Sequence, residues 1–199
     1  MIFETNHLYH IYNQGNNREN VYYSRQNYLL FINKISKYLI PYVDILAWCL
    51  MPNHFHLMVY VNSTEIENQT EESIDNHYKN RTLNNSIAII LRSYAEIINK
   101  EQDRVGSLFR QKTKAVCLDP ENGCLPAWYT IAGLNKINYQ FPQDQYPQIC
   151  FNYIHNNPVA SRLAKDISSW EFSSASEILG LVESKLVNKQ RVIEFGLQI

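Results

Sequence analysis

Short apolar or alternating stretches separate longer segments with helical spacing along this chain of 199 residues. Alternation places neighbouring side chains on opposite faces of a strand, whereas apolar residues three and four apart share one face of a helix. The pattern predicts strands at residues 7–12, 43–50, 54–61 and 108–118, and helices at 25–39, 86–100, 147–157 and 184–195.

The first six elements follow the order β-α-β-β-α-β. Residues 51–53 are too few for anything but a tight hairpin between the second and third strands. This order is that of a ferredoxin-like α+β fold, an antiparallel sheet with its two helices on one face. The opposite face is then free to receive the added helix at 147–157.

The chain is predicted to form one domain over residues 1–160, with 161–199 as an extension packed on it. Residues 62–85 are polar and acidic and predict a loop insertion, with Ser86 or Asn85 capping the helix that follows. Residues 119–146 look irregular, with a short helix at 127–136.

Composition places few limits on function. The net charge is −1, but four bases and no acid lie between Arg104 and Lys114. No apolar run is long enough to span a bilayer, and no signal peptide is evident, so we expect a cytoplasmic protein. The four cysteines lack zinc-knuckle spacing and are expected to be reduced, buried thiols: Cys49, Cys117, Cys124 and Cys150.

His54 and His56 lie two residues apart in a predicted strand and should therefore project from the same face. Two imidazoles on one face form half of a metal site, although a His-x-His pair is also common by chance. In the helix at 147–157, Tyr153 and Asn157 are four residues apart and share a face. His155 points away from that face and either packs or contacts a ligand.

Two imidazoles, an amide oxygen and a phenol suit phosphodiester cleavage. A divalent cation polarises a phosphate oxygen, and a tyrosine hydroxyl can attack phosphorus to form a covalent ester. Considered alone, Tyr153 could also be one of many tyrosines packed in a core.

Five segments, in order along the chain, carry a resemblance to a known family. Met-Pro-Asn-His-Phe-His-Leu-Met-Val at 51–59 resembles the His-hydrophobe-His (HUH) motif of single-tyrosine transposases. Tyr-Ile-His-Asn-Asn-Pro-Val at 153–159 resembles the tyrosine helix of REP-associated tyrosine transposases. Residues 9–15, 106–110 and 170–174 match the same family.

This resemblance implies His54, His56 and Asn157 as ligands of Mg²⁺ or Mn²⁺, and Tyr153 as the nucleophile. It also implies cleavage of single-stranded DNA next to a hairpin, a 5′-phosphotyrosine intermediate, and rejoining without ATP. The enzyme would be a monomer or a homodimer. The cations predicted to hold DNA are Arg18, Arg104, Arg110, Lys112 and Lys114, the last three on alternate positions of one strand.

Two other functions fit the same pattern. One is a non-catalytic single-stranded nucleic-acid-binding protein on the same fold, and the other is a metal-dependent hydrolase that uses water. A covalent protein–DNA adduct distinguishes the first hypothesis from both.

Overall fold

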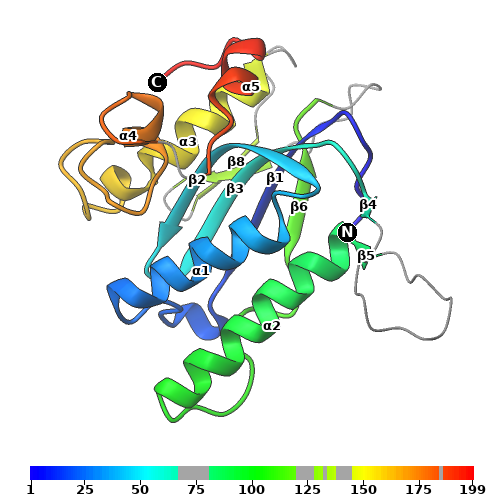
Figure 1. The fold of residues 1–199 in the computed structure, drawn as a ribbon. Helices are drawn as coiled ribbons and strands as arrows, with labels where there is room; N and C mark the ends of the chain where they lie inside the picture. The colour runs from blue at the N-terminus through cyan, green and yellow to red at the C-terminus, as the bar shows by residue number, and fades with distance from the viewer. Residues whose placement is uncertain (67–80, 120–127, 132–133, 138–144, 184–185) are drawn as a thin grey trace, which may run out of the picture.

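The computed structural model describes residues 1–66, 81–119, 128–131, 134–137, 145–183 and 186–199. It contains one four-stranded sheet, with the strand order β2-β3-β1-β6 and antiparallel pairing throughout (Figure 1). The strands of this sheet are β1 (Leu8–Gln14), β2 (Val43–Met51), β3 (His54–Val61) and β6 (Lys114–Cys117). The helices are α1 (Arg25–Tyr38), α2 (Leu83–Glu101), α3 (Tyr146–Ala160), α4 (Ala175–Ile178) and α5 (Lys189–Glu194), with a 3-10 turn at Asn16–Arg18.

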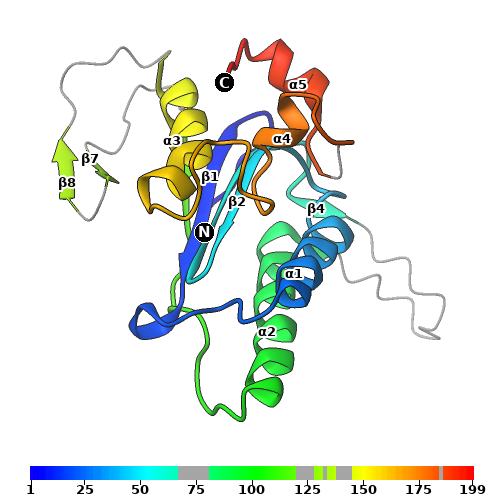
Figure 2. The same ribbon diagram turned by 90° about the vertical axis from the view of Figure 1, so that its left-hand side faces the viewer.

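The molecule has three layers. Figure 2 shows α1 and α2 on one face of the sheet and α3 on the other. This confirms the predicted α+β class, because the four strands and two helices follow the β-α-β-β-α-β order and α3 is added to the free face.

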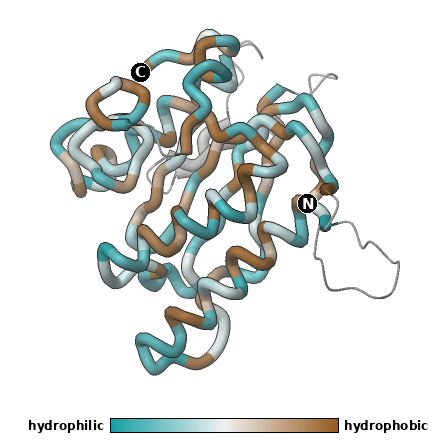
Figure 3. Tube along the Cα trace, viewed as in Figure 1, coloured by the Kyte–Doolittle hydropathy of each residue, from teal (hydrophilic) through white to brown (hydrophobic). Residues whose placement is uncertain are grey.

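The core fills the space between the sheet and the first two helices. Phe31 of α1 lies 5.2 Å from Phe55 of β3 and 4.9 Å from Tyr94 of α2, measured between ring centroids. Hydrophobic positions run along the central strands and recur along α1 and α2 (Figure 3). Phe55 therefore faces the two helices, and the alternating neighbours of Phe55 in β3 face α3.

The predicted bounds of β3 and α1 agree with the structure, and two local signals explain where the helices begin. Ser24 and Asn27 form a capping box at the start of α1. Thr82 caps α2 by accepting a hydrogen bond from the Asn85 backbone, so the helix begins three residues before Ser86.

Four predictions of local structure were wrong. The helix predicted at 184–195 begins only at Lys189, where the Asn188 side chain caps α5. The strand at 108–118 shortens to β6, because Phe109 instead bridges to Gly15. The helix at 127–136 is replaced by a hairpin of β7 (Trp128–Ile131) and β8 (Leu134–Ile137). The helix predicted at 147–157 extends to Ala160 as α3, with Pro158 in its last turn, which closes through a hydrogen bond from the Ser161 backbone to the Asn157 carbonyl.

Two short strands flank part of the predicted loop at 62–85. Strand β4 (Glu65–Ile66) pairs with β5 (Arg81–Thr82), and the residues between them lie outside the described part of the chain. Cys49 and Cys150 are buried free thiols, as predicted, whereas Cys117 is half-buried; Cys124 also lies outside the described residues.

The C-terminal residues pack along β2. The Leu50 backbone donates to the Phe172 carbonyl at 2.8 Å, and Val187 bridges to Ile45. Ser174 is fully buried, and its hydroxyl accepts a hydrogen bond from the Trp48 backbone at 2.9 Å. In the described part of the chain, no helix combines the length and apolarity needed to cross a membrane.

Ser174→Ala is expected to lower the free energy of unfolding by about 2–4 kcal/mol, because it leaves two buried polar groups without a partner. Besides the Trp48 amide, the Ser174 hydroxyl bonds His155 Nε2 at 2.7 Å and so ties α3 to β2. Urea unfolding measures the loss. Ser176→Ala, which removes one half-buried hydrogen bond to the Ser168 carbonyl, is the control, and an equal loss in both variants would contradict this assignment.

Candidate active site

The sheet presents His54 and His56 from the same face of β3. The ring centroids of these two residues are 5.0 Å apart, and the rings are nearly perpendicular, at 83°. His56 is buried, and His54 lies at the start of the strand and is half-buried. The rigid, paired strand holds both imidazoles in a fixed relation.

Helix α3 brings Tyr153 and Asn157 onto these imidazoles. The Tyr153 ring stands edge-on to His56, with 5.2 Å between centroids and an angle of 78°. The buried Asn157 side chain lies close enough to the His54 ring and the Tyr153 hydroxyl to shift the pKa of both, and its Nδ2 has no hydrogen-bond partner among the described residues. Two pairs of residues, separated by about a hundred positions in the sequence, thus meet in one place.

A third histidine, His10 of β1, completes the cluster and was missed by the sequence analysis. Its Nε2 lies 2.9 Å from His56 Nδ1, and its ring stacks on those of His56 and Tyr12. The signal that could have found it is strand order. In a ferredoxin-like sheet the first strand lies beside the third, so a histidine of β1 on the same face as His56 must approach it.

The nitrogen atoms of the site fit a bound cation. Asn53 donates its amide to the Arg18 carbonyl and so presents its oxygen to His54 Nδ1, 2.6 Å away. Because both Nδ1 atoms have partners, the Nε2 atoms of His54 and His56 are the ones that can bind a metal. His56 Nε2 is buried and has no hydrogen-bond partner among the described residues.

Outer hydrogen bonds of this kind fix the tautomer and orientation of a ligating histidine. Together with the Asn157 amide oxygen, the two Nε2 atoms provide three neutral donors. Such a set leaves coordination positions open for phosphate oxygens and water.

Burial sets the protonation state of the site. It lowers the pKa of His10 to about 3 and that of His56 well below its usual value, with smaller effects on His56 from His10 and His54. It also lowers the pKa of His54. The imidazoles are therefore neutral at pH 7, as metal ligands must be. Burial raises the pKa of the Tyr153 hydroxyl, and the nearby Asn157 side chain opposes that rise.

His155 packs and does not enter the site. Its Nδ1 donates to the Phe151 carbonyl at 2.9 Å, and its Nε2 lies 2.7 Å from Ser174 Oγ. Burial lowers the pKa of His155 to about 4. This resolves the alternative left open by the sequence in favour of packing.

The buried histidines are expected to make the fold acid-sensitive. Unfolded histidine takes up a proton below about pH 6.5, whereas His10 and His155 stay neutral in the fold to about 3 and 4. The unfolded state then binds more protons, so stability falls as pH drops from 6.5 towards 4. Between pH 7 and pH 5 each residue should account for about 2 kcal/mol. Urea unfolding of wild type and His155→Gln at both pH values tests this. A variant that loses as much unfolding free energy between pH 7 and pH 5 as the wild type would contradict it.

Arg18 and Arg110 are exposed beside the end of the sheet that carries His54. The Arg18 carbonyl accepts a hydrogen bond from the Asn53 side chain at 3.1 Å. The Arg110 backbone donates to the Gln14 carbonyl at 2.9 Å, and Gln14 pairs with His54 across β1 and β3. The structure therefore places the backbone of these two residues at the His54 end of the sheet.

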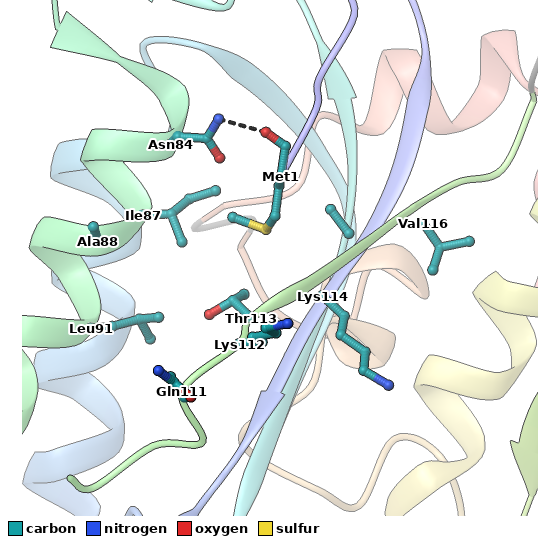
Figure 4. A pocket seen from close by; sticks show the side chains of 11 residues that line it. Met1, Asn84, Ile87, Ala88, Leu91, Gln111, Lys112, Thr113, Lys114 and Val116 are labelled. Carbon is teal, nitrogen blue, oxygen red and sulfur yellow. Dashed lines mark hydrogen bonds between the residues drawn. The ribbon is translucent and has the colours of Figure 1, made fainter.

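The other three predicted cations lie in different surroundings. Lys114 of β6 pairs with Tyr12, and its Nζ lies 6.0 Å from that ring, on the side of the sheet that carries α3 (Figure 4). Lys112 precedes β6, so the predicted alternation does not extend to it; it lines a groove of about 700 Å³ against α2. Arg104 is paired with Glu19 at 2.6 Å.

Comparison with known proteins gives one structural match at the fold level. No family model matches the chain, and no curated protein matches it. The fold is similar to that of a solved structure of a REP-associated tyrosine transposase bound to a REP hairpin. The TM-score is 0.55 at 14% sequence identity, over 90% of this chain and 83% of that chain. At this identity the likeness shows a shared fold.

Proposed function

We propose that this protein is a metal-dependent single-stranded DNA endonuclease and strand transferase, a transposase that acts next to DNA hairpins. The observation that carries the proposal is the position of Tyr153, whose ring stands edge-on to that of His56 with 5.2 Å between centroids. A tyrosine held against two neutral imidazoles that can bind a metal is an arrangement suited to covalent phosphodiester cleavage. The neighbour's fold and its bound hairpin support the same class of substrate.

The chemistry begins when the Tyr153 hydroxyl gives up its proton to solvent and its oxygen attacks phosphorus, forming an ester with the 5′-phosphate. The bond from phosphorus to the leaving 3′ oxygen breaks, and that oxygen takes up a proton. A second 3′-hydroxyl then attacks the phosphotyrosine, releases Tyr153 and restores a DNA strand. The ester stores the energy of the broken bond, so no nucleotide cofactor is needed.

Each neighbouring side chain has a defined part in this scheme. His54, His56 and Asn157 would hold Mg²⁺ or Mn²⁺, which neutralises charge on the phosphate. Asn157 also orients the Tyr153 hydroxyl and favours the ionised phenol that burial disfavours. His10 holds His56 through the bond between Nε2 and Nδ1 and so leaves the remaining nitrogen of His56 for the cation.

The same geometry supports a DNA path and action within one chain. Arg18 and Arg110 flank the His54 end of the sheet, and Lys114 lies beside Tyr12 on the face of Tyr153. A phosphate at the histidine pair would have these cations along its two neighbouring segments. Tyr153 meets the histidines of its own chain, which supports a monomer that cuts in cis.

A labelled hairpin oligonucleotide with single-stranded flanks tests the proposal. Incubation with Mn²⁺ is expected to give a protein–DNA adduct that survives denaturation, together with a free 3′-hydroxyl fragment. Cleavage without an adduct would favour a hydrolase that uses water. Binding without cleavage, over a panel of hairpins, would favour a non-catalytic nucleic-acid-binding protein.

A further inference from the structure

A second group of metal-binding side chains lies at the start of β1, apart from the histidines of β3. One ligand atom each from His7, Cys117 and Asp119 lies within 4.8 Å of the other two. Among the residues that the structure describes, these are the three His, Cys, Asp or Glu side chains that meet this condition. The DNA cleavage proposed above uses none of these three side chains.

The separations match those of a tetrahedral zinc site. His7 Nδ1 lies 3.4 Å from Asp119 Oδ1, and Cys117 Sγ lies 3.6 Å from the same oxygen. Ligands bound to Zn²⁺ at its usual bond lengths stand about 3.3–3.8 Å apart. Imidazole nitrogen, thiolate sulfur and carboxylate oxygen are all common zinc ligands, and a water can take the fourth position.

The groups around the far side of the His7 ring also suit a histidine that binds a metal. The far nitrogen of its ring, Nε2, faces the Glu4 carboxylate at 3.9 Å. His7 Nδ1 lies 3.2 Å from the Asp119 carbonyl oxygen and 3.4 Å from Asp119 Oδ1. With an ion bound between these groups, a carboxylate beside Nε2 would favour the tautomer that directs the Nδ1 lone pair at the metal. Carboxylate, histidine and metal often occur in this order in zinc proteins.

The backbone holds this corner in place without a metal. The Leu8 amide donates to Asp119 Oδ1 at 2.8 Å, and the Leu118 amide donates to the Leu8 carbonyl at 2.8 Å. These bonds fix the carboxylate beside the half-buried side chains of His7 and Cys117. The ligands are thus pre-positioned, which lowers the cost of ordering them around an ion.

We propose that His7, Cys117 and Asp119 bind a zinc ion that fastens the start of β1 to the edge strand β6. Binding replaces the Cys117 thiol proton with the metal and releases one proton to solvent. The ion joins segments that are about a hundred residues apart in sequence and therefore stabilises the folded state over the unfolded one.

Cobalt(II) is the probe, because a thiolate bound to it gives a near-ultraviolet charge-transfer band. The full-length protein carries His54→Ala and His56→Ala, so the other histidine pair cannot contribute. One equivalent of Co²⁺ is expected to saturate the band, and Zn²⁺ to remove it. Zn²⁺ should also raise the melting temperature of this variant.

Three further substitutions decide which side chains bind. Cys117→Ser should abolish the band, whereas Cys150→Ala should keep it, since Cys150 lies in α3 beside Tyr153. Glu4→Gln should leave the band but weaken Co²⁺ binding about 10-fold, as the loss of an outer partner does. Glu4 is exposed, so this variant gives a readout even if Cys117→Ser does not fold.

Two results would overturn the zinc site. One is a protein that shows no thiolate–cobalt band at millimolar Co²⁺, and the other is a band that survives Cys117→Ser. Neither result bears on DNA cleavage by Tyr153, because the readout involves no DNA.

Discussion

Replacing Tyr153 by phenylalanine is expected to abolish the protein–DNA adduct and to slow cleavage by about 10³-fold or more. The substitution removes one oxygen, the proposed nucleophile, and leaves the ring that packs against His56. The phenol has no structural partner other than Asn157 in the site described above, so the fold should survive. Denaturing gels with a labelled hairpin substrate measure both adduct and cleavage.

Tyr60→Phe is the matched control for this change. Tyr60 lies on the same strand and face as His56, four residues further on, and its hydroxyl bonds the Asn6 side chain at 3.2 Å. It should cleave at the wild-type rate. An adduct that persists in Tyr153→Phe, at a rate similar to that of Tyr60→Phe, would show that the nucleophile is another residue.

The second large effect is expected from His56→Ala, which removes one of the three donors proposed to bind the metal. Its buried Nε2 has no hydrogen-bond partner in the described part of the chain, so the substitution takes away a ligand without disturbing a network at that atom. Mn²⁺-dependent cleavage should fall by about 10²–10³-fold, since a metal supplies several kcal/mol of charge stabilisation to the transition state.

His56→Gln serves as the comparison for this second variant. An amide oxygen can still bind Mn²⁺, so His56→Gln should keep more activity than His56→Ala, and raising the Mn²⁺ concentration should restore part of it. Initial rates over a Mn²⁺ titration separate the two. Cleavage by His56→Ala at the wild-type rate would show that His56 does not bind the metal.

Local sequence patterns predicted the four strands of the sheet in order. They also predicted that Tyr153 and Asn157 would face His54 and His56. Alternation in β3 gave the shared face of His54 and His56, because strand geometry has a period of two whatever the tertiary context. The four-residue spacing in α3 placed Tyr153 and Asn157 together for the corresponding helical reason. The order of elements then left one face of the sheet for α3.

Features that depend on long-range contacts were missed. His10 acquires its part from a hydrogen bond to His56, 46 residues away, and nothing next to it in the sequence marks it. The ion pair between Arg104 and Glu19 likewise joins residues 85 positions apart, and the sequence around Arg104 does not indicate it. The hairpin of β7 and β8 replaced a predicted helix, since pairing decides short ambiguous segments.

The most direct test of the account is to identify the residue that carries DNA in the covalent adduct. The adduct is digested with nuclease and protease, and the modified peptide is sequenced by mass spectrometry. The account predicts a 5′-phosphorylated nucleotide on Tyr153. A nucleotide on Tyr12, whose ring stacks on His10 in the same cluster, or on any other residue would contradict it.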